Sequence, residues 1–320
     1  MKEIYNPIFL EHNTGQHPEN GRRLECLDIH EYTDITVDGE EYLMLVHEKA
    51  HVERIREASA LGSVSLDQDT LVSSGSYHAA VAAVGASIMA SQQNAFALVR
   101  PPGHHAYRDH ASGFCLFNNI AIATEALRRA GKRIFILDFD GHLGDGTSHF
   151  FYHSDEVMFW SLHQFPAFPG MGRSSEIGEG KGKGFTVNVP LPAGSGDDIF
   201  LHAFRIYLPL IEQFQPDYLA ISAGFDAHRY DPLLQLNLTA NTFYEIGKLI
   251  KNSCPSAFAV LEGGYNTDML PHCINNFLAG INGLEIAFDE GHTSSSRQMW
   301  EQYDFNVHLG ISNLNPYWKF

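Results

Sequence analysis

Three aspartates and a histidine lie close together in ILDFDGHLGDGT, residues 136–147, directly after an apolar run. Alternate side chains of an extended segment share one face, so Asp138, Asp140 and His142 are expected to point the same way. Carboxylate oxygen and imidazole nitrogen are ligands for zinc, iron or manganese. Asp226, in SAGFDAH, follows another apolar run and is the best candidate for a third ligand. Three protein ligands and one open position are typical of a catalytic metal site, whereas a lone Asp-x-His is more often structural.

Two adjacent histidines, His104 and His105 of RPPGHH, follow a further apolar run. Asp138 and Asp145 are available to accept a ring N–H from each of them, which fixes the tautomer and raises the basicity of the other nitrogen. Paired His–Asp units beside a metal can serve as general base and general acid. Tyr265, in LEGGYN, could donate a hydrogen bond to an oxyanion, although a turn with a tyrosine at its rim is the ordinary interpretation of GGY alone.

The elements that position these residues alternate along the chain. Apolar runs predict strands over 95–99, 133–140, 157–163, 185–191, 217–222 and 257–264. Helical patterns lie between them, over 77–93, 118–131, 197–214 and 240–252. This alternation predicts a mostly parallel sheet with helices on both faces. Five strand candidates are followed by polar motifs, at the carboxyl edge where such sheets bind ligands. No repeat or linker divides the chain, so we expect a single domain over residues 1–320.

Composition limits the partners. With 21 Lys+Arg against 38 Asp+Glu, the net charge of −17 opposes nucleic-acid binding and favours neutral or cationic substrates. The chain contains no CxxC pair, so a zinc site built on thiolates is not predicted. Four cysteines in 320 residues do not indicate a disulfide framework. The sequence shows neither a signal peptide nor the ~18 consecutive apolar residues of a membrane-spanning helix. We therefore expect a cytoplasmic enzyme or binding protein, and the sequence leaves homo-oligomer formation open.

Eight motifs occur in a fixed order along the chain and together carry a resemblance to a known family: HPENGRRL, RPPGHHA, SGFCLFNN, DFDGHLGDGT, SLHQFPAFPG, VNVPLPAG, SAGFDAHRYDP and LEGGYN. Over roughly residues 8–285 the chain resembles the zinc-dependent histone deacetylase superfamily, in the style of class II and its bacterial relatives, which include acetylpolyamine amidohydrolases. The resemblance implies an α/β arginase/deacetylase fold, a single domain with a central, mostly parallel sheet of about eight strands flanked by helices. It also implies a metal-dependent deacetylase that hydrolyses linear amides.

Site residues follow from the resemblance one by one. It implies Zn²⁺, with Fe²⁺ as the alternative metal, on Asp140, His142 and Asp226. His104 would be the general base, oriented by Asp138. His105, oriented by Asp145, would be the electrostatic or acid partner, and Tyr265 would polarise the acyl carbonyl.

The resemblance also implies substrate contacts and two structural K⁺ or Na⁺ sites. Phe114 and Phe168 match the aromatic pair around the acyl-lysine stem, and Gly113 would offer its main-chain carbonyl. The inner cation site would use Asp138, Asp140, His142, Ser161 and Leu162. The outer site would use Phe151, Ser154, Val157 and Phe185.

Two positions depart from related patterns. Leu143 stands where the family usually has a second histidine, which leaves the packing behind the metal open. Leu233 stands where polyamine deacetylases often have a glutamate, so acetyl-lysine-like segments rank slightly ahead of acetylpolyamines as substrates. Asp67 and Asp69 are candidate rim carboxylates, although ordinary solvated charges are the simpler interpretation. Two alternatives stay open: an arginase-like ureohydrolase, which needs two manganese ions, and a non-catalytic ligand sensor.

Overall fold

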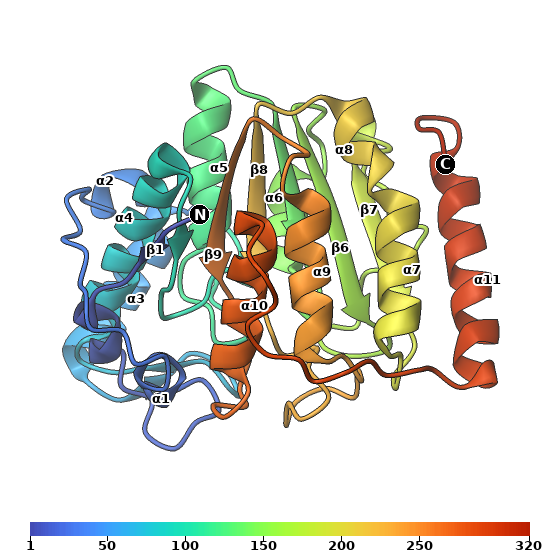
Figure 1. Ribbon diagram of the computed structural model, residues 1–320. Helices are drawn as coiled ribbons and strands as arrows, with labels where there is room; N and C mark the ends of the chain where they lie inside the picture. Colours follow the sequence, from blue (N-terminus) through green and yellow to red (C-terminus); the bar gives the residue numbers. More distant parts are fainter.

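A seven-stranded, entirely parallel sheet forms the centre of the computed structural model, which describes residues 1–320. The strand order is β1-β4-β9-β8-β5-β6-β7 (Figure 1). The strands are β1 (Glu3–Ile4), β4 (Phe96–Ala97), β5 (Ile134–Asp138), β6 (Val157–Gln164), β7 (Thr186–Leu191), β8 (Tyr218–Ala223) and β9 (Ser256–Leu261). Every residue of β5 and β6 is buried, which explains why these strands are nearly continuous apolar runs.

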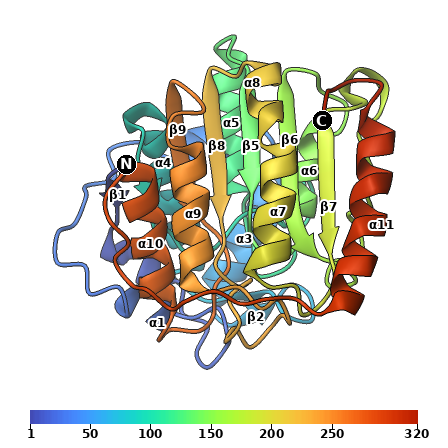
Figure 2. The same ribbon diagram turned by 45° about the vertical axis from the view of Figure 1, so that its right-hand side comes forward.

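Helices cover both faces of this sheet. The first half of the chain contains η1 (Pro7–Glu11), α1 (Arg22–Glu25), α2 (Glu40–Leu43), α3 (Lys49–Leu61), α4 (Ser76–Gln93), α5 (Asn119–Arg129) and α6 (Asp145–Phe151). The second half contains η2 (Gly180–Gly182), α7 (Asp197–Tyr207), α8 (Pro209–Phe214), α9 (Ala240–Ile250), α10 (Leu270–Asn282) and α11 (Arg297–Leu314). Figure 2 shows α7, α9 and α10 in front of the sheet and α4 and α5 behind it. No helix combines the length and apolar character required to span a bilayer.

Helix α11 protects the edge of the sheet beside β7 (Figure 2). Asn306 donates from its side chain to the carbonyl of Pro190 at 3.2 Å, and the Trp318 indole N–H donates to the carbonyl of Gly184 at 2.6 Å. An uncovered edge strand would offer unpaired main-chain groups to other chains. The C-terminal segment therefore closes one side of the sheet.

The six strand predictions and the α/β class are confirmed, with differences in detail. The segment 197–214 is two helices, α7 and α8, because Pro209 cannot continue the hydrogen bonding of α7 and instead starts α8. The expected count of about eight strands is corrected to seven. Two further extended pieces, β2 (Val64–Ser65) and β3 (Leu71–Val72), pair antiparallel with each other and add nothing to the central sheet.

Candidate active site

Asp140, His142 and Asp226 form a three-ligand cluster at the carboxyl edge of the sheet. Their donor atoms lie within 4.8 Å of one another, and this is the one such group of three in the chain. His142 Nδ1 lies 2.8 Å from Asp226 Oδ2 and 3.3 Å from Asp140 Oδ1. Asp140 follows β5 and Asp226 follows β8, and these strands are neighbours in the sheet. Parallel pairing therefore brings together ligands that lie 86 positions apart in sequence, counted as 226 − 140.

Two glycines allow the carboxylates to approach the main chain. A Cβ atom at Gly224 would lie 1.8 Å from Asp140 Oδ2, and one at Gly263 would lie 2.4 Å from Asp226 Oδ2. The main-chain N–H of Gly263 donates to Asp140 Oδ2 at 2.7 Å, and that of Gly141 donates to Asp226 Oδ1 at 2.6 Å. Any larger residue at Gly224 or Gly263 would displace a ligand.

The electrostatics of the cluster fit a divalent cation. Burial and the neighbouring Asp140 raise the pKa of Asp226. Burial alone would lower the pKa of His142, but Asp226 and Asp140 outweigh it and raise that pKa to about 10. Two buried carboxylates thus share one imidazole, and with that imidazole neutral their charge sums to −2. Carboxylate and imidazole donors fit zinc or iron, which supply the missing positive charge.

The two histidines of RPPGHH lie beside this cluster with different partners. His104 Nδ1 is 3.2 Å from Asp138 Oδ2, and its Nε2 is 3.9 Å from Asp140 Oδ1. His105 Nδ1 is 2.6 Å from Asp145 Oδ1. Burial lowers the pKa of His104, but Asp140 and Asp138 outweigh burial and hold it well above its usual range. Burial and the adjacent His104 lower the pKa of His105 to about 4, so His105 stays neutral near pH 7.

Aromatic side chains surround the approach to these groups. Phe114 meets Tyr265 edge-to-face with ring centroids 5.6 Å apart, and Phe168 meets His105 in the same way at 5.0 Å. Phe168 is 45% exposed, so this aromatic group reaches solvent. Gly113 has φ +51°, and a Cβ there would lie 2.5 Å from His105 and 3.0 Å from Phe168. The structure thus places Phe114 against Tyr265, and Gly113 and Phe168 against His105.

The rim carboxylates have separate environments. Thr70 Oγ1 accepts the main-chain N–H of Phe114 at 3.2 Å, and Thr70 is itself held by Asp67 through hydrogen bonds of 2.6 and 3.0 Å. Asp67 thereby supports the aromatic wall. Burial and Asp67 raise the pKa of Asp69, which is exposed. Leu233 brings no carboxylate; its N–H donates to Asp231 Oδ1 at 3.0 Å.

The residues expected at the monovalent cation sites lie on β5 and β6, at the end of α6 and in the segments that connect these elements and β7. Asp138 lies opposite Ser161 in the β5–β6 register, close to the three-ligand cluster. At the outer site the Phe151 carbonyl accepts the N–H of Ser154, and the Phe185 carbonyl accepts the N–H of Phe159, each at 2.9 Å. Both cation sites stay predictions.

Leu143, which stands where the family usually has a second histidine, is buried in the core. A Cβ at Gly172 would lie 3.1 Å from its Cδ2 atom, so the two are in close contact. Leu143 also lines a cavity of about 280 Å³ together with Tyr107, Asp145, Ser148, His149, Tyr152, Met171 and Glu176. The position is filled by apolar packing, and the three ligands still converge.

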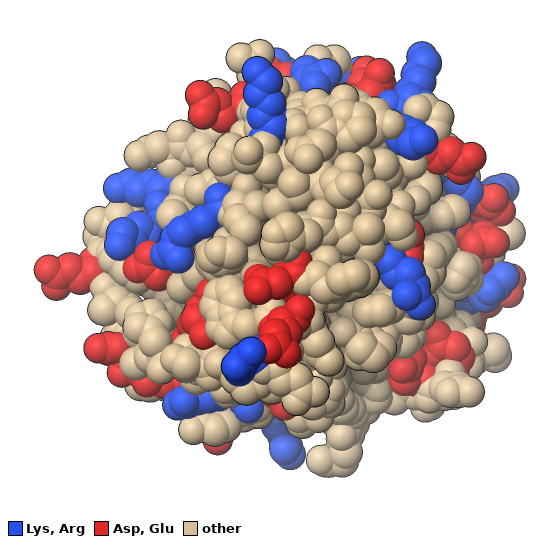
Figure 3. Space-filling model, turned by 90° about the vertical axis from the view of Figure 1, so that its right-hand side faces the viewer, with Lys and Arg blue, Asp and Glu red and all other residues tan.

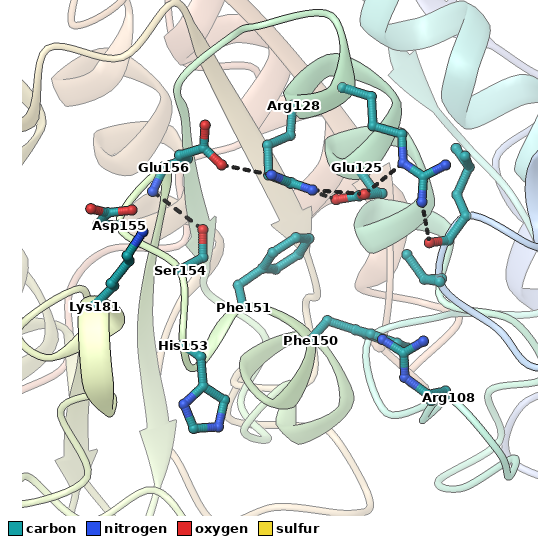
Figure 4. Close-up of a pocket in the computed structure, with 13 residues that line it drawn as sticks. Arg108, Glu125, Arg128, Phe150, Phe151, His153, Ser154, Asp155, Glu156 and Lys181 are labelled. Carbon is teal, nitrogen blue, oxygen red and sulfur yellow. Dashed lines mark hydrogen bonds and ion pairs between the residues drawn. The ribbon is translucent and has the colours of Figure 1, made fainter.

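A second cavity lies away from the three-ligand cluster. It measures about 420 Å³ near the amino-terminal end of β6, and Figure 4 shows Phe150 and Phe151 on its wall. Arg128 is engaged there, because it pairs with Glu125 at 2.7 Å and with Glu156 at 2.6 Å. The cavity contains no member of the catalytic set, so it is not a candidate for the reaction.

Two buried residues that contact the site were missed. Arg23 donates to the carbonyls of Glu262 and Gly264, at 2.5 and 2.7 Å, and its guanidinium lies 5.0 Å from the centre of the Tyr265 ring. Glu262 accepts the main-chain N–H groups of Gly103 and His104. Both residues stand in the quoted motifs HPENGRRL and LEGGYN, and that was the only signal in the sequence. Main-chain contacts between distant segments leave no local pattern.

Comparison with known proteins adds independent information. A family model described as the histone deacetylase domain matches residues 17–281. The chain is 35% identical over 330 residues to a probable deacetylase of Archaeoglobus fulgidus, covering 94% of this chain and 92% of that protein. It is 36% identical over 296 residues to a histone deacetylase-like amidohydrolase of Pseudomonas aeruginosa, covering 85% and 78%. The crystal structure of the HDA15 HD domain is similar with a TM-score of 0.89 and 28% identity, covering 98% of this chain and 95% of that one.

Proposed function

The chain belongs to the histone deacetylase family and is a hydrolase of amides other than peptide bonds, and we propose that it uses zinc to remove acyl groups from amines. The cluster of Asp140, His142 and Asp226 carries this proposal, since two carboxylates and one imidazole converge there and neither carboxylate pairs with an Arg or Lys side chain. Zinc bound by these residues would polarise the acyl carbonyl and lower the pKa of water. An arginase-like reaction needs a second set of metal ligands, and no second three-ligand group is present.

The proposed proton transfers use His104. Asp138 holds its Nδ1–H, which leaves Nε2 facing the ligand cluster as the proton acceptor. Asp140 is the largest contributor to the raised pKa of His104, so a metal ion on Asp140 would offset that charge and lower the pKa. Nε2 would then take a proton from the attacking water and return it to the departing amine nitrogen. The low pKa of His105 favours His104 for both transfers, because His105 holds no second proton near pH 7. His105 instead donates to Asp145 and presents a neutral ring.

Tyr265 is the proposed oxyanion donor. Burial holds the pKa of its hydroxyl well above the usual range, so the proton stays available for donation throughout a normal assay. A donor that strengthens its hydrogen bond as the carbonyl oxygen becomes negative lowers the barrier more than it strengthens substrate binding.

Substrates of the proposed reaction are acyl-lysine segments first and acetylpolyamines second. The aromatic opening formed by Phe114 and Phe168 suits a straight methylene stem. A dedicated polyamine site needs an anchor for a distant ammonium group. Leu233 supplies none, and Asp67 is engaged by Thr70. Asp69 is the exposed carboxylate left for that role.

Metal analysis combined with an activity assay tests this function. The purified protein is analysed for zinc and iron, stripped with a chelator and reloaded with each ion, and then assayed on an acetyl-lysine peptide and on an acetylated diamine. We expect one ion per chain and activity that is lost and restored with it. Full activity in protein free of metal would refute the proposal.

A further inference from the structure

Two buried carboxylates outside the ligand cluster contact the main chain of the proposed catalytic residues. Glu262 is completely buried at the end of β9, and its Oε2 atom accepts the N–H groups of Gly103 at 2.7 Å and His104 at 3.1 Å. Its Oε1 atom accepts the hydroxyl of Ser222 at 3.2 Å. One side chain thus connects the ends of β8 and β9 to the RPPGHH loop.

Asp231 has the corresponding contact on the other side of the site. Its Oδ2 atom accepts the N–H of Tyr265 at 2.7 Å, and its Oδ1 atom accepts the N–H of Leu233 at 3.0 Å. Asp231 is buried as well. Neither Asp231 nor Glu262 forms a side-chain ion pair with Arg or Lys.

We propose that Glu262 and Asp231 are positioning residues, which fix the backbone of His104 and Tyr265 respectively through main-chain hydrogen bonds. This inference rests on the proposed roles of His104 and Tyr265. His104 and Tyr265 both lie in irregular segments after strands, where no regular ladder of main-chain hydrogen bonds holds the backbone. A buried carboxylate oxygen that accepts a main-chain N–H supplies the missing constraint.

The energetic cost of these two acids supports a functional interpretation. Burial raises the pKa of Glu262 to about 7 and that of Asp231 to about 7. A raised pKa means that folding disfavours the ionised form, so a carboxylate at either position destabilises the protein near neutral pH relative to a neutral acceptor. A role in positioning catalytic residues therefore explains the buried carboxylates of Glu262 and Asp231 better than a contribution to folding stability does.

Which oxygen accepts each hydrogen bond decides what an amide substitution does, and the result differs between the two acids: Glu262→Gln should keep its main-chain contacts, whereas Asp231→Asn should lose one. In Glu262→Gln the amide oxygen can take both N–H groups, because both already use one oxygen, while the amide nitrogen donates to the Ser222 hydroxyl. In Asp231→Asn the two N–H groups use different oxygens, so one of them would face an amide N–H and lose its acceptor. Glu262→Leu removes the acceptor for Gly103 and His104 altogether.

Steady-state kinetics with metal analysis tests the inference. A misplacement of about 1 Å at a reacting group costs on the order of 10²-fold in rate, so we expect Glu262→Leu and Asp231→Asn to lower kcat by about 10- to 100-fold. KM and metal content should change little, since neither acid has a hydrogen bond to the side chain of a metal ligand. Glu262→Gln should keep kcat within about threefold of the parent protein, and Ser222→Ala is the control that removes a contact to Glu262 but leaves both N–H groups paired.

The roles of Glu262 and Asp231 stand or fall separately. Equal losses in Glu262→Gln and Glu262→Leu would show that the charge matters and would overturn the positioning role of Glu262. An unimpaired Asp231→Asn would overturn that of Asp231. If Glu262→Leu does not fold, Glu262→Met at matched length replaces it and is judged by the same criterion. His104→Ala and Tyr265→Phe with normal kcat would instead refute the proposed function, which distinguishes the two failures.

Discussion

Replacing Tyr265 with phenylalanine isolates the hydroxyl from the ring that carries it. The ring is held by the edge of Phe114 at 5.6 Å and by the guanidinium of Arg23 at 5.0 Å, and both contacts survive the substitution. Tyr265 is fixed to the rest of the site through its main-chain N–H, which donates to Asp231. We therefore expect the fold, the metal content and KM to stay unchanged.

The expected loss falls on kcat. The hydroxyl would act on the developing oxyanion, and one such donor is worth on the order of 10²–10³ in kcat, or about 2.7–4 kcal/mol of transition-state stabilisation. The assay is the initial rate of deacetylation at saturating acetyl-lysine peptide, with a solvent isotope effect to establish that proton transfer limits turnover. Tyr230→Phe is the matched control, because Tyr230 is 56% exposed and its ring lies outside the ligand cluster. An unchanged kcat for Tyr265→Phe, with chemistry rate-limiting, would remove this hydroxyl from the mechanism.

Three further predictions follow from charges and burial. Asp226→Ala should lose most of its metal while the protein stays folded, and full zinc content by elemental analysis in the folded variant would contradict the ligand assignment. Burial, and after it the neighbouring His51, lowers the pKa of His47 to about 3, although the hydrogen bond from its Nδ1–H to the Tyr107 carbonyl acts in the opposite direction. Its Nε2 accepts the N–H of Asn118, as only a neutral ring can. A histidine with a lowered folded pKa stabilises above its unfolded pKa near 6.5, so that contribution should fall by ~1.4 kcal/mol per pH unit on acidification, and His47→Gln should have a flatter dependence in urea titrations at pH 7, 6 and 5. The net charge of −17 should raise kcat/KM for a cationic acetylated diamine over that for an acidic peptide at low salt, and this advantage should shrink at high salt. The charges are not of one sign everywhere, because acidic and basic side chains are mixed on the α11 side (Figure 3). A ratio of the two kcat/KM values that does not change with salt would mean that pocket shape alone selects the substrate.

The sequence predicted those parts of the site that follow strands. Asp140 and Asp226 stand just after apolar runs, and parallel pairing places the ends of such runs at one edge. The three-ligand cluster and both His–Asp pairs could therefore be expected from the residues alone. The aromatic pair and the monovalent cation sites came only from the resemblance, since a phenylalanine in a loop has no distinctive spacing of its own.

Other features could not be predicted because they depend on contacts between distant segments. Arg23 reaches the carbonyl of Gly264 across 241 positions of sequence. An arginine in a short helix is ordinarily solvated, and only the folded chain places it beneath the loop that carries Tyr265. The position of α11 beside β7 could not be predicted either. Its apolar residues show that the helix packs against the protein, but not which strand it covers. The apolar runs predicted six of the seven strands and missed β1, because β1 has two residues and leaves almost no periodicity. The count of about eight came only from the resemblance.

Each buried acid of the site has a partner that offsets the cost of its burial, which explains how several acids can lie close together. Asp138 and Asp145 each hold one imidazole ring, at 3.2 and 2.6 Å, which offsets their burial. Asp140 and Asp226 receive main-chain N–H groups and share the single ring of His142. Removing the proton from that ring leaves two carboxylates facing each other in a buried space, which is stable only with a cation between them. Gly263 has two functions there, because its lack of a Cβ admits Asp226 while its N–H donates to Asp140.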